Sequence, residues 1–350
     1  MSMEIHERPG VYSVYDASRV VSGNSRSKTA AVAAGWKNHV GEVLTFTRSE
    51  EAMEALGESA AADDLPALIC LLLKNGAAAV TAAIVAENGG KTDYEAAFEQ
   101  LEELEGIDIV VCGSTDAEIQ QAMRDSVCAA SNARRERIAV AAPAKGESVT
   151  GLIAQAAKLN SERVILVGCA DGASSGVAMA AAAAGAIAGE DDPAVPLSGA
   201  ELSGVSAAAK QYTDNEIDRL VQGGVTPLEC VGGVVSVVRG VTTRTKTGEA
   251  SDETWREIST ILIVDDVIPA VRNALRSKFR RAKNTAQTRG AIRSQVILEL
   301  ENKKSREIIT EYGEVTVEAM KDTPTACLVE FSFSVTSGLN QICLTAHITV

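Results

Sequence analysis

Two hydrophobic periods alternate along residues 66–190. Short continuous apolar runs alternate with longer segments whose apolar residues recur every three or four positions. The first pattern is typical of strands buried on both faces, and the second of helices that cover them. The alternation therefore predicts a mostly parallel α/β sheet. Its expected strands are 79–85, 107–112, 137–142 and 163–167, and its expected helices are 65–74, 94–105, 116–131, 148–159 and 177–188.

The segments on either side of this region have less regular patterns. Two short strands, 29–35 and 41–46, are expected before a helix that Ser49 caps at its N-terminus. Residues 190–264 are rich in turn signals such as Gly223-Gly224 and Gly232-Gly233. We expect strands over 227–230, 234–242 and 260–264, with Asp265 and Asp266 capping a helix over 267–281 and a second helix over 288–303.

Both ends of the chain have strand patterns. Residues 1–22 predict an extended arm, and the C-terminal segments 316–319, 327–335 and 341–350 predict strands. A terminal strand this regular has to be held by something, and pairing with a distant segment or another chain is the direct way. Whether 331–335 closes the chain's own sheet is left open. The residues predicted to pair between subunits are Val11, Tyr12, Val14, Tyr15, Ile342, Leu344, Ala346, Ile348 and Val350.

Composition excludes several classes of protein. The chain has 350 residues, of which 46% are apolar and 23% charged, with a net charge of −14. An acidic chain repels phosphate backbones, and 3% aromatic residues give few platforms for base stacking, so we expect no nucleic-acid partner. The seven cysteines include no CxxC pair and favour small buried side chains, so we expect no metal and no cofactor. No segment predicts a signal peptide or membrane insertion, which favours synthesis in the cytoplasm.

One loop is suited to an enzyme. Asn88-Gly89-Gly90-Lys91-Thr92 lies between an expected strand and helix, which is the context of a phosphate-binding loop. The spacing is against it, because the first glycine of that motif would fall at Val85. Helix capping by Thr92 or Asp93 explains the same residues. The alternative function is therefore an α/β nucleotide-binding enzyme that uses Gly89–Thr92, with Asp265 as a metal-binding partner.

A basic stretch differs from the rest of this acidic chain. No acidic residue occurs from Val267 to Leu298, whereas eight of the 33 basic residues do. This stretch is either a face balanced by acids elsewhere in the fold or a docking face for an acidic partner. Nucleic acid would also fit the charge, although no recognised motif accompanies it. The eight residues are Arg272, Arg276, Lys278, Arg280, Arg281, Lys283, Arg289 and Arg293.

Four segments in this order resemble contractile tail sheath proteins of phages and phage-like particles such as tailocins and prophage tails. They are ERPGVYSVY (7–15), GGVTPLECVGGVVSVVRGVTT (223–243), IPAVRNALRSKFRRAKNTAQTRGAIRSQV (268–296) and FSFSVTSGLNQICLTAHITV (331–350). The chain lacks the large outer insertions of longer members. Residues 238–240 stand where many members of this family have an aromatic-containing turn.

The resemblance implies a structural subunit of a virion or phage-like particle tail, not an enzyme. Its fold would be a discontinuous α+β assembly core, 23–65 with 195–335, and an inserted, mostly parallel α/β sandwich domain, 66–194. An N-terminal arm, 1–22, and a C-terminal strand arm, 336–350, would complete sheets of neighbouring copies. The implied partners are further copies in stacked hexameric rings, the tail tube protein, and baseplate and tail terminator proteins. A contact with the tube must release, so it should be polar rather than apolar. We therefore expect the basic helix to face the tube.

Overall fold

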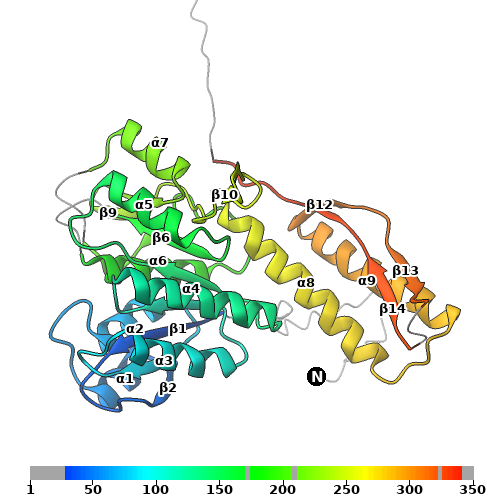
Figure 1. The fold of residues 1–350 in the computed structure, drawn as a ribbon, viewed down its shortest axis with the longest axis horizontal. Helices are drawn as coiled ribbons and strands as arrows, with labels where there is room; N and C mark the ends of the chain where they lie inside the picture. The colour runs from blue at the N-terminus through cyan, green and yellow to red at the C-terminus, as the bar shows by residue number, and fades with distance from the viewer. Residues whose placement is uncertain (1–27, 170–173, 207–210, 322–324, 341–350) are drawn as a thin grey trace, which may run out of the picture.

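A nine-stranded, mostly parallel sheet forms the centre of the protein (Figure 1). The computed structural model describes residues 28–169, 174–206, 211–321 and 325–340. Strand order is β2-β3-β1-β4-β5-β6-β8-β9-β7. The consecutive strands β3-β1-β4-β5-β6-β8 in this order run parallel to one another. The strands are β1 Thr29–Gly35, β2 Val43–Phe46, β3 Ala79–Val85, β4 Ile109–Cys112, β5 Ile138–Ala141, β6 Val164–Gly168, β7 Glu201–Leu202, β8 Thr226–Val231 and β9 Val234–Val237.

Helices cover both faces of this sheet. Alternate residues of β1 show the two layers: Ala30, Val32 and Ala34 belong to one core, and Ala31 and Ala33 to the other. The first core lies under α1, α2 and α6, and the second under α3, α4, α5 and α7. The sheet and these helices are called the α/β body below. The helices are α1 Ser49–Leu56, α2 Leu65–Lys74, α3 Lys91–Glu103, α4 Ala117–Asn132, α5 Val149–Leu159, α6 Gly176–Gly189 and α7 Asp214–Gln222.

A second unit, here called the C-terminal unit, extends away from the body along a long helix (Figure 1). Helices α8, Ile258–Phe279, and α9, Ala286–Ser305, pack with two separate two-stranded antiparallel sheets around a third core. The β12 strand pairs with β15, and β13 pairs with β14. A small hairpin, β10–β11, precedes α8. These strands are β10 Lys246–Thr247, β11 Ala250–Ser251, β12 Ile309–Tyr312, β13 Thr316–Ala319, β14 Cys327–Glu330 and β15 Phe333–Val335.

Helix α8 belongs to both units. Ile258 and Ile261 are buried in the first core of the body, whereas Ile263, Val267 and Val271 are buried in the third core. The predicted strand 260–264 is therefore wrong, and Asp265 and Asp266 lie inside the helix instead of capping it. The β-branched run resembled a buried strand, but tertiary packing on two sides selects a helix.

The sheet divides the chain differently from the expected division into core and insertion. Residues 29–35 lie between β3 and β4, at the centre of the sheet that was assigned to the insertion. Strand β8 extends the same sheet through parallel pairing with β6. A strand buried on both faces reads as a continuous apolar run, which is how 29–35 reads. Within the described subunit, residues 29–65 therefore share their core with 66–194.

The predicted arms lie largely outside the described residues. That is true of residues 1–22 and of 341–350, and so of every residue predicted to pair between subunits. The described part of the C-terminal arm, 336–340, crosses back to the body. Thr336 donates its amide to the Ile308 carbonyl (3.3 Å), and Ser198 donates its hydroxyl to Asn340 Oδ1 (2.8 Å).

Candidate assembly interface and interdomain junction

The Gly89–Thr92 loop has a structural explanation. Gly90 caps α3, and its amide donates to Asp93 Oδ2 (2.8 Å). A Cβ on Gly89 would lie 2.5 Å from the Val85 side chain, so close packing explains that glycine. The Lys91 ammonium lies 3.8 Å from Glu95 and 3.6 Å from Glu118, in exposed ion pairs. The loop follows the carboxyl end of β3.

The structure does not bring Asp265 to this loop. Asp265 binds Arg163, which directly precedes β6 and so lies at the amino edge of the parallel sheet. In folds of this type, ligands bind where the strand order reverses, at the carboxyl edge, here between β1 and β4. At that point a Cβ on Gly113 would lie 2.5 Å from the Ala34 Cβ, so close packing of β4 against β1 explains this glycine. The enzyme alternative therefore gains no support from this geometry.

The eight basic residues on and between α8 and α9 fall into two groups. Four of them are held within the subunit. Arg272 pairs with Glu136 (2.5 Å), and Lys278 donates to Gln295 Oε1 (2.5 Å). Arg289 donates to Asn284 Oδ1 (2.9 Å), and Arg293 to the Val315 carbonyl (2.7 Å). These four of the eight predicted residues are thus engaged by partners within the subunit.

The other four lie at the C-terminal end of α8 and in the turn before α9. All four are exposed, and among the described residues no hydrogen bond or ion pair engages their side chains. In a chain of net charge −14, four neighbouring cations without an internal partner form a distinct surface. This group, called the free cation patch below, is Arg276, Arg280, Arg281 and Lys283.

A charged cleft of about 690 Å³ lies where α8 crosses the amino edge of the sheet. Its walls are the turns before β1, β4 and β5, one side of α8 and the C-terminal end of α9. Three ion pairs join elements that are distant in sequence. Arg163 binds Asp265 with two bonds of 2.8 and 3.0 Å, and Arg272 binds Glu136. Lys303 of α9 binds Asp266 (2.5 Å), and its side chain is only 10% exposed.

Burial changes the acidity of this junction. Desolvation raises the pKa of Asp265 to about 6, and the neighbouring carboxylates Glu136 and Asp108 add to that rise. The ion pair with Arg163 lowers the pKa of Asp265 and so opposes this rise. The same ion pair raises the pKa of the Arg163 guanidinium, although desolvation of Arg163 acts in the opposite direction. Burial and the two like charges act in the same direction, so the pKa of Asp265 rises even though Arg163 is its partner. Burial thus makes Asp265 a weaker acid than an exposed aspartate.

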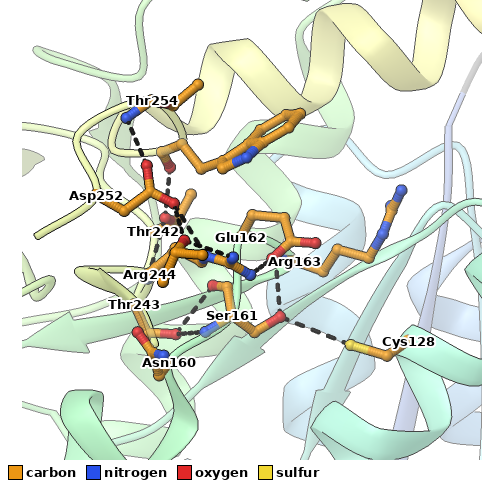
Figure 2. A network of polar contacts seen from close by, with 12 residues as sticks. Cys128, Asn160, Ser161, Glu162, Arg163, Thr242, Thr243, Arg244, Asp252 and Thr254 are labelled. Atoms are coloured by element: carbon orange, nitrogen blue, oxygen red, sulfur yellow. Dashed lines mark hydrogen bonds and ion pairs between the residues drawn. The ribbon is translucent and has the colours of Figure 1, made fainter. Parts of the chain in front are cut away.

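A second polar network fastens the segment after β9 to the turn before β6 (Figure 2). Thr243 donates its hydroxyl to the Ser161 carbonyl and accepts from the Ser161 amide, both at 3.1 Å. Arg244 pairs with Glu162 (2.9 Å) and with Asp252 (3.4 Å). Because these contacts lie just before α8, they fix where the C-terminal unit leaves the body.

The C-terminal unit has open strand edges. Within the described residues, β12 and β15 pair only with each other, and so do β13 and β14. Isolated two-stranded sheets are marginal in water and accept further strands readily. Phe333–Val335 therefore closes the chain's own sheet, which answers the question left open by the sequence. Phe331, Phe333 and Val335 pack against the third core, as their alternation predicts.

Sequence reasoning missed the junction residues. Arg163 and Asp108 directly precede β6 and β4 at the amino edge, and Glu136 lies two residues before β5. Their position at one sheet edge was a usable signal, but Asp265, the partner of Arg163, was predicted to cap a helix instead of lying inside α8. Among the described residues, no helix is long and apolar enough to cross a bilayer, and no group of three His, Cys, Asp or Glu side chains is arranged to hold a metal ion.

Comparison with known proteins agrees with this architecture. Residues 87–243 match the family model of the phage tail sheath protein central domain, and residues 250–349 match that of the phage tail sheath C-terminal domain. A tail sheath protein of Bacillus phage SP01 is 30% identical over 135 residues. That match covers 38% of this chain but only 23% of the phage protein, so it spans about a quarter of that relative.

Solved structures share the fold over nearly the whole chain. The sheath tail protein of Desulfitobacterium hafniense superposes with a TM-score of 0.72 at 13% identity, covering 94% of this chain and 97% of that one. The contracted helical sheath of the anti-feeding prophage also gives 0.72, at 16% identity, covering 98% and 99%. The contracted sheath of the PVC extracellular contractile injection system gives 0.69 at 14%, covering 99% of each chain. With both family models matched, the chain belongs to the phage tail sheath proteins and is a structural sheath subunit of a contractile tail.

Proposed function

We propose that this chain polymerises into stacked hexameric rings around a tail tube and contracts to drive that tube through a target envelope. The C-terminal unit carries the proposal. Within the described residues it has two short sheets whose edges carry no further strand, and a strand-patterned tail follows them. The match to the sheath C-terminal domain runs to residue 349 and so includes this tail. Strand addition supplies main-chain hydrogen bonds that survive large rotations of the bodies they connect.

In this proposal the arms, residues 1–22 and the tail from 341, complete sheets of neighbouring subunits. The α/β body and the C-terminal unit then have different roles in the assembly. The C-terminal unit holds the mesh together, and the body forms the outer wall. Contacts that do not close on themselves generate a helical filament, which is the geometry that a sheath requires. Baseplate and tail terminator proteins would cap the two ends, and the product would be a virion or a phage-like particle.

Truncation after residue 340 tests strand exchange. It removes the tail but keeps β15 and the Ser198–Asn340 hydrogen bond. We expect a folded chain with an unchanged circular dichroism spectrum that no longer polymerises in light scattering. Full-length chain prepared in parallel is the control. Normal polymers from the truncated chain would contradict the proposal.

We further propose that the free cation patch contacts the tube. Among the described residues its side chains have no hydrogen-bond or ion-pair partner, whereas Arg272 and Arg293 are held inside the subunit. An exposed charged contact forms and releases easily, because screening and solvation keep its strength modest. This suits a sheath that must slide off its tube. The expected partner surface is acidic.

Charge reversal tests the patch. The triple variant Arg276→Glu, Arg280→Glu and Arg281→Glu should reduce co-sedimentation of the chain with purified tail tubes at least tenfold. The matched control is Lys145→Glu, Lys158→Glu and Lys246→Glu, which reverses the same number of exposed cations outside the patch. Equal binding by both triple variants would overturn this assignment. Retention of the wild-type chain on DNA that weakens with salt would favour nucleic acid as the partner instead.

A further inference from the structure

A short segment, residues 336–340, connects β15 to the C-terminal tail. It is called the strap below, and Figure 1 shows it in red, running back from the C-terminal unit to the α/β body. Gly338 and Asn340 are half-buried, whereas Ser337 and Leu339 are exposed. Exposure that alternates with a period of two is typical of an extended segment with one packed face. The strap is therefore packed along the surface of the subunit.

The body receives the strap on one turn, residues 192–200. A Cβ added to Gly338 would lie 2.7 Å from the Pro196 Cβ, and Ser198 donates its hydroxyl to Asn340 Oδ1 (2.8 Å). The φ angle of Gly338 is outside the left-handed region, so the close approach to Pro196 explains this glycine. Docking of the strap thus depends on one hydrogen bond and on one contact that a larger side chain would block.

The turn that receives the strap is itself firmly held. Ala194 is buried in the third core and Leu197 in the first core, so the turn is anchored in both units. The Gly199 amide donates to the Val237 carbonyl of β9 (2.7 Å), and the Val237 amide donates to the Ala200 carbonyl (3.0 Å). Packed side chains and paired backbone resist displacement. The end of the docked strap is therefore fixed relative to both units.

We propose that this turn positions the C-terminal tail for strand exchange. The tail follows the strap directly at residue 341, so the docked strap sets where the tail leaves the subunit. A tail that starts from a fixed point loses less conformational freedom on pairing with a neighbouring copy than a tail on a loose tether. The inference rests on the strand exchange proposed above. It adds Pro196, Ser198 and Gly338 as positioning residues, which act through the strap.

Polymerisation of the full-length chain tests this role, measured as the critical concentration in light scattering. Gly338→Val should undock the strap and raise the critical concentration at least about tenfold, because each added subunit must then order a loose tail. Its urea unfolding midpoint should not change, because the strap lies outside the three cores. The matched control is Ser337→Val, at the adjacent exposed position, which should polymerise as the wild type does.

A second pair of variants tests the hydrogen bond between the turn and the strap. Ser198→Ala removes the donor to Asn340 and should also raise the critical concentration. Ser198→Thr keeps a hydroxyl at this position and should polymerise as the wild type does. A purely structural role predicts instead that the urea midpoint falls whenever polymerisation weakens, and that result would overturn the positioning role.

The truncation after residue 340 separates this inference from strand exchange itself. If the truncated chain does not polymerise but Gly338→Val and Ser198→Ala both polymerise as the wild type does, the positioning role is wrong and strand exchange stands. If the truncated chain polymerises normally, strand exchange is wrong and the positioning role is wrong with it.

Discussion

At the scale of single residues, the sequence does not reveal which charged side chains are buried and which groups they bind. Arg137 shows this most clearly. Its side chain is buried and donates to the carbonyls of Leu101 (2.7 Å), Leu104 (2.8 Å) and Arg135 (3.2 Å). It thereby caps the C-terminal end of α3 from the turn directly before β5. Burial, with a smaller contribution from nearby Arg135, lowers the pKa of this guanidinium to about 10. In sequence, the residue looks like any charged strand end.

We predict that Arg137→Gln lowers the free energy of unfolding by about 2 kcal/mol, because buried carbonyls lose their charged donor. Urea denaturation measures this. Arg280→Gln, at an exposed position, is the matched control and should change stability by less than about 0.5 kcal/mol. Equal stability of the two variants would show that Arg137 does not cap α3.

At the scale of elements, strands buried on both faces were the most predictable. Segments 29–35 and 79–85 read as continuous apolar runs, and the structure has them as strands with the same bounds. The start of helix α8 was predicted wrongly as a strand. Its apolar side chains are buried in two different cores, so no single helical face is apolar. Strand β12 and helix α7 also escaped notice. Pairing and packing partners distant in sequence decide such elements.

Helix α9 gives a prediction at this scale. Gly290 lies within its first two turns, and a Cβ added there would meet nothing within 4 Å. Alanine costs less backbone entropy in a helix than glycine does. Gly290→Ala should therefore raise the free energy of unfolding by about 0.5–1 kcal/mol. Gly113→Ala is the counterpart, because its Cβ would meet Ala34 at 2.5 Å, and it should instead destabilise the chain. Thermal unfolding of both variants checks the opposite signs.

At the scale of the whole molecule, the candidate site was only partly predictable. The basic stretch 267–298 was visible in the sequence, but its division into held and free cations depends on partners such as Glu136 and Val315. The residues predicted for strand pairing lie outside the described ranges, so the arms remain a prediction. The domain division changed because β1 inserts between β3 and β4. When parallel strands that are distant in sequence pair with each other, no local sequence pattern shows which strands are neighbours.

The central claim is that this chain is an assembling sheath subunit, and its most direct test is electron microscopy of the purified full-length chain. We predict ring stacks or tubes with an open lumen, because the described part of the C-terminal unit has unpaired strand edges and the chain carries a strand-patterned tail for them. A monodisperse small oligomer at every concentration, with saturable nucleotide binding, would contradict the account.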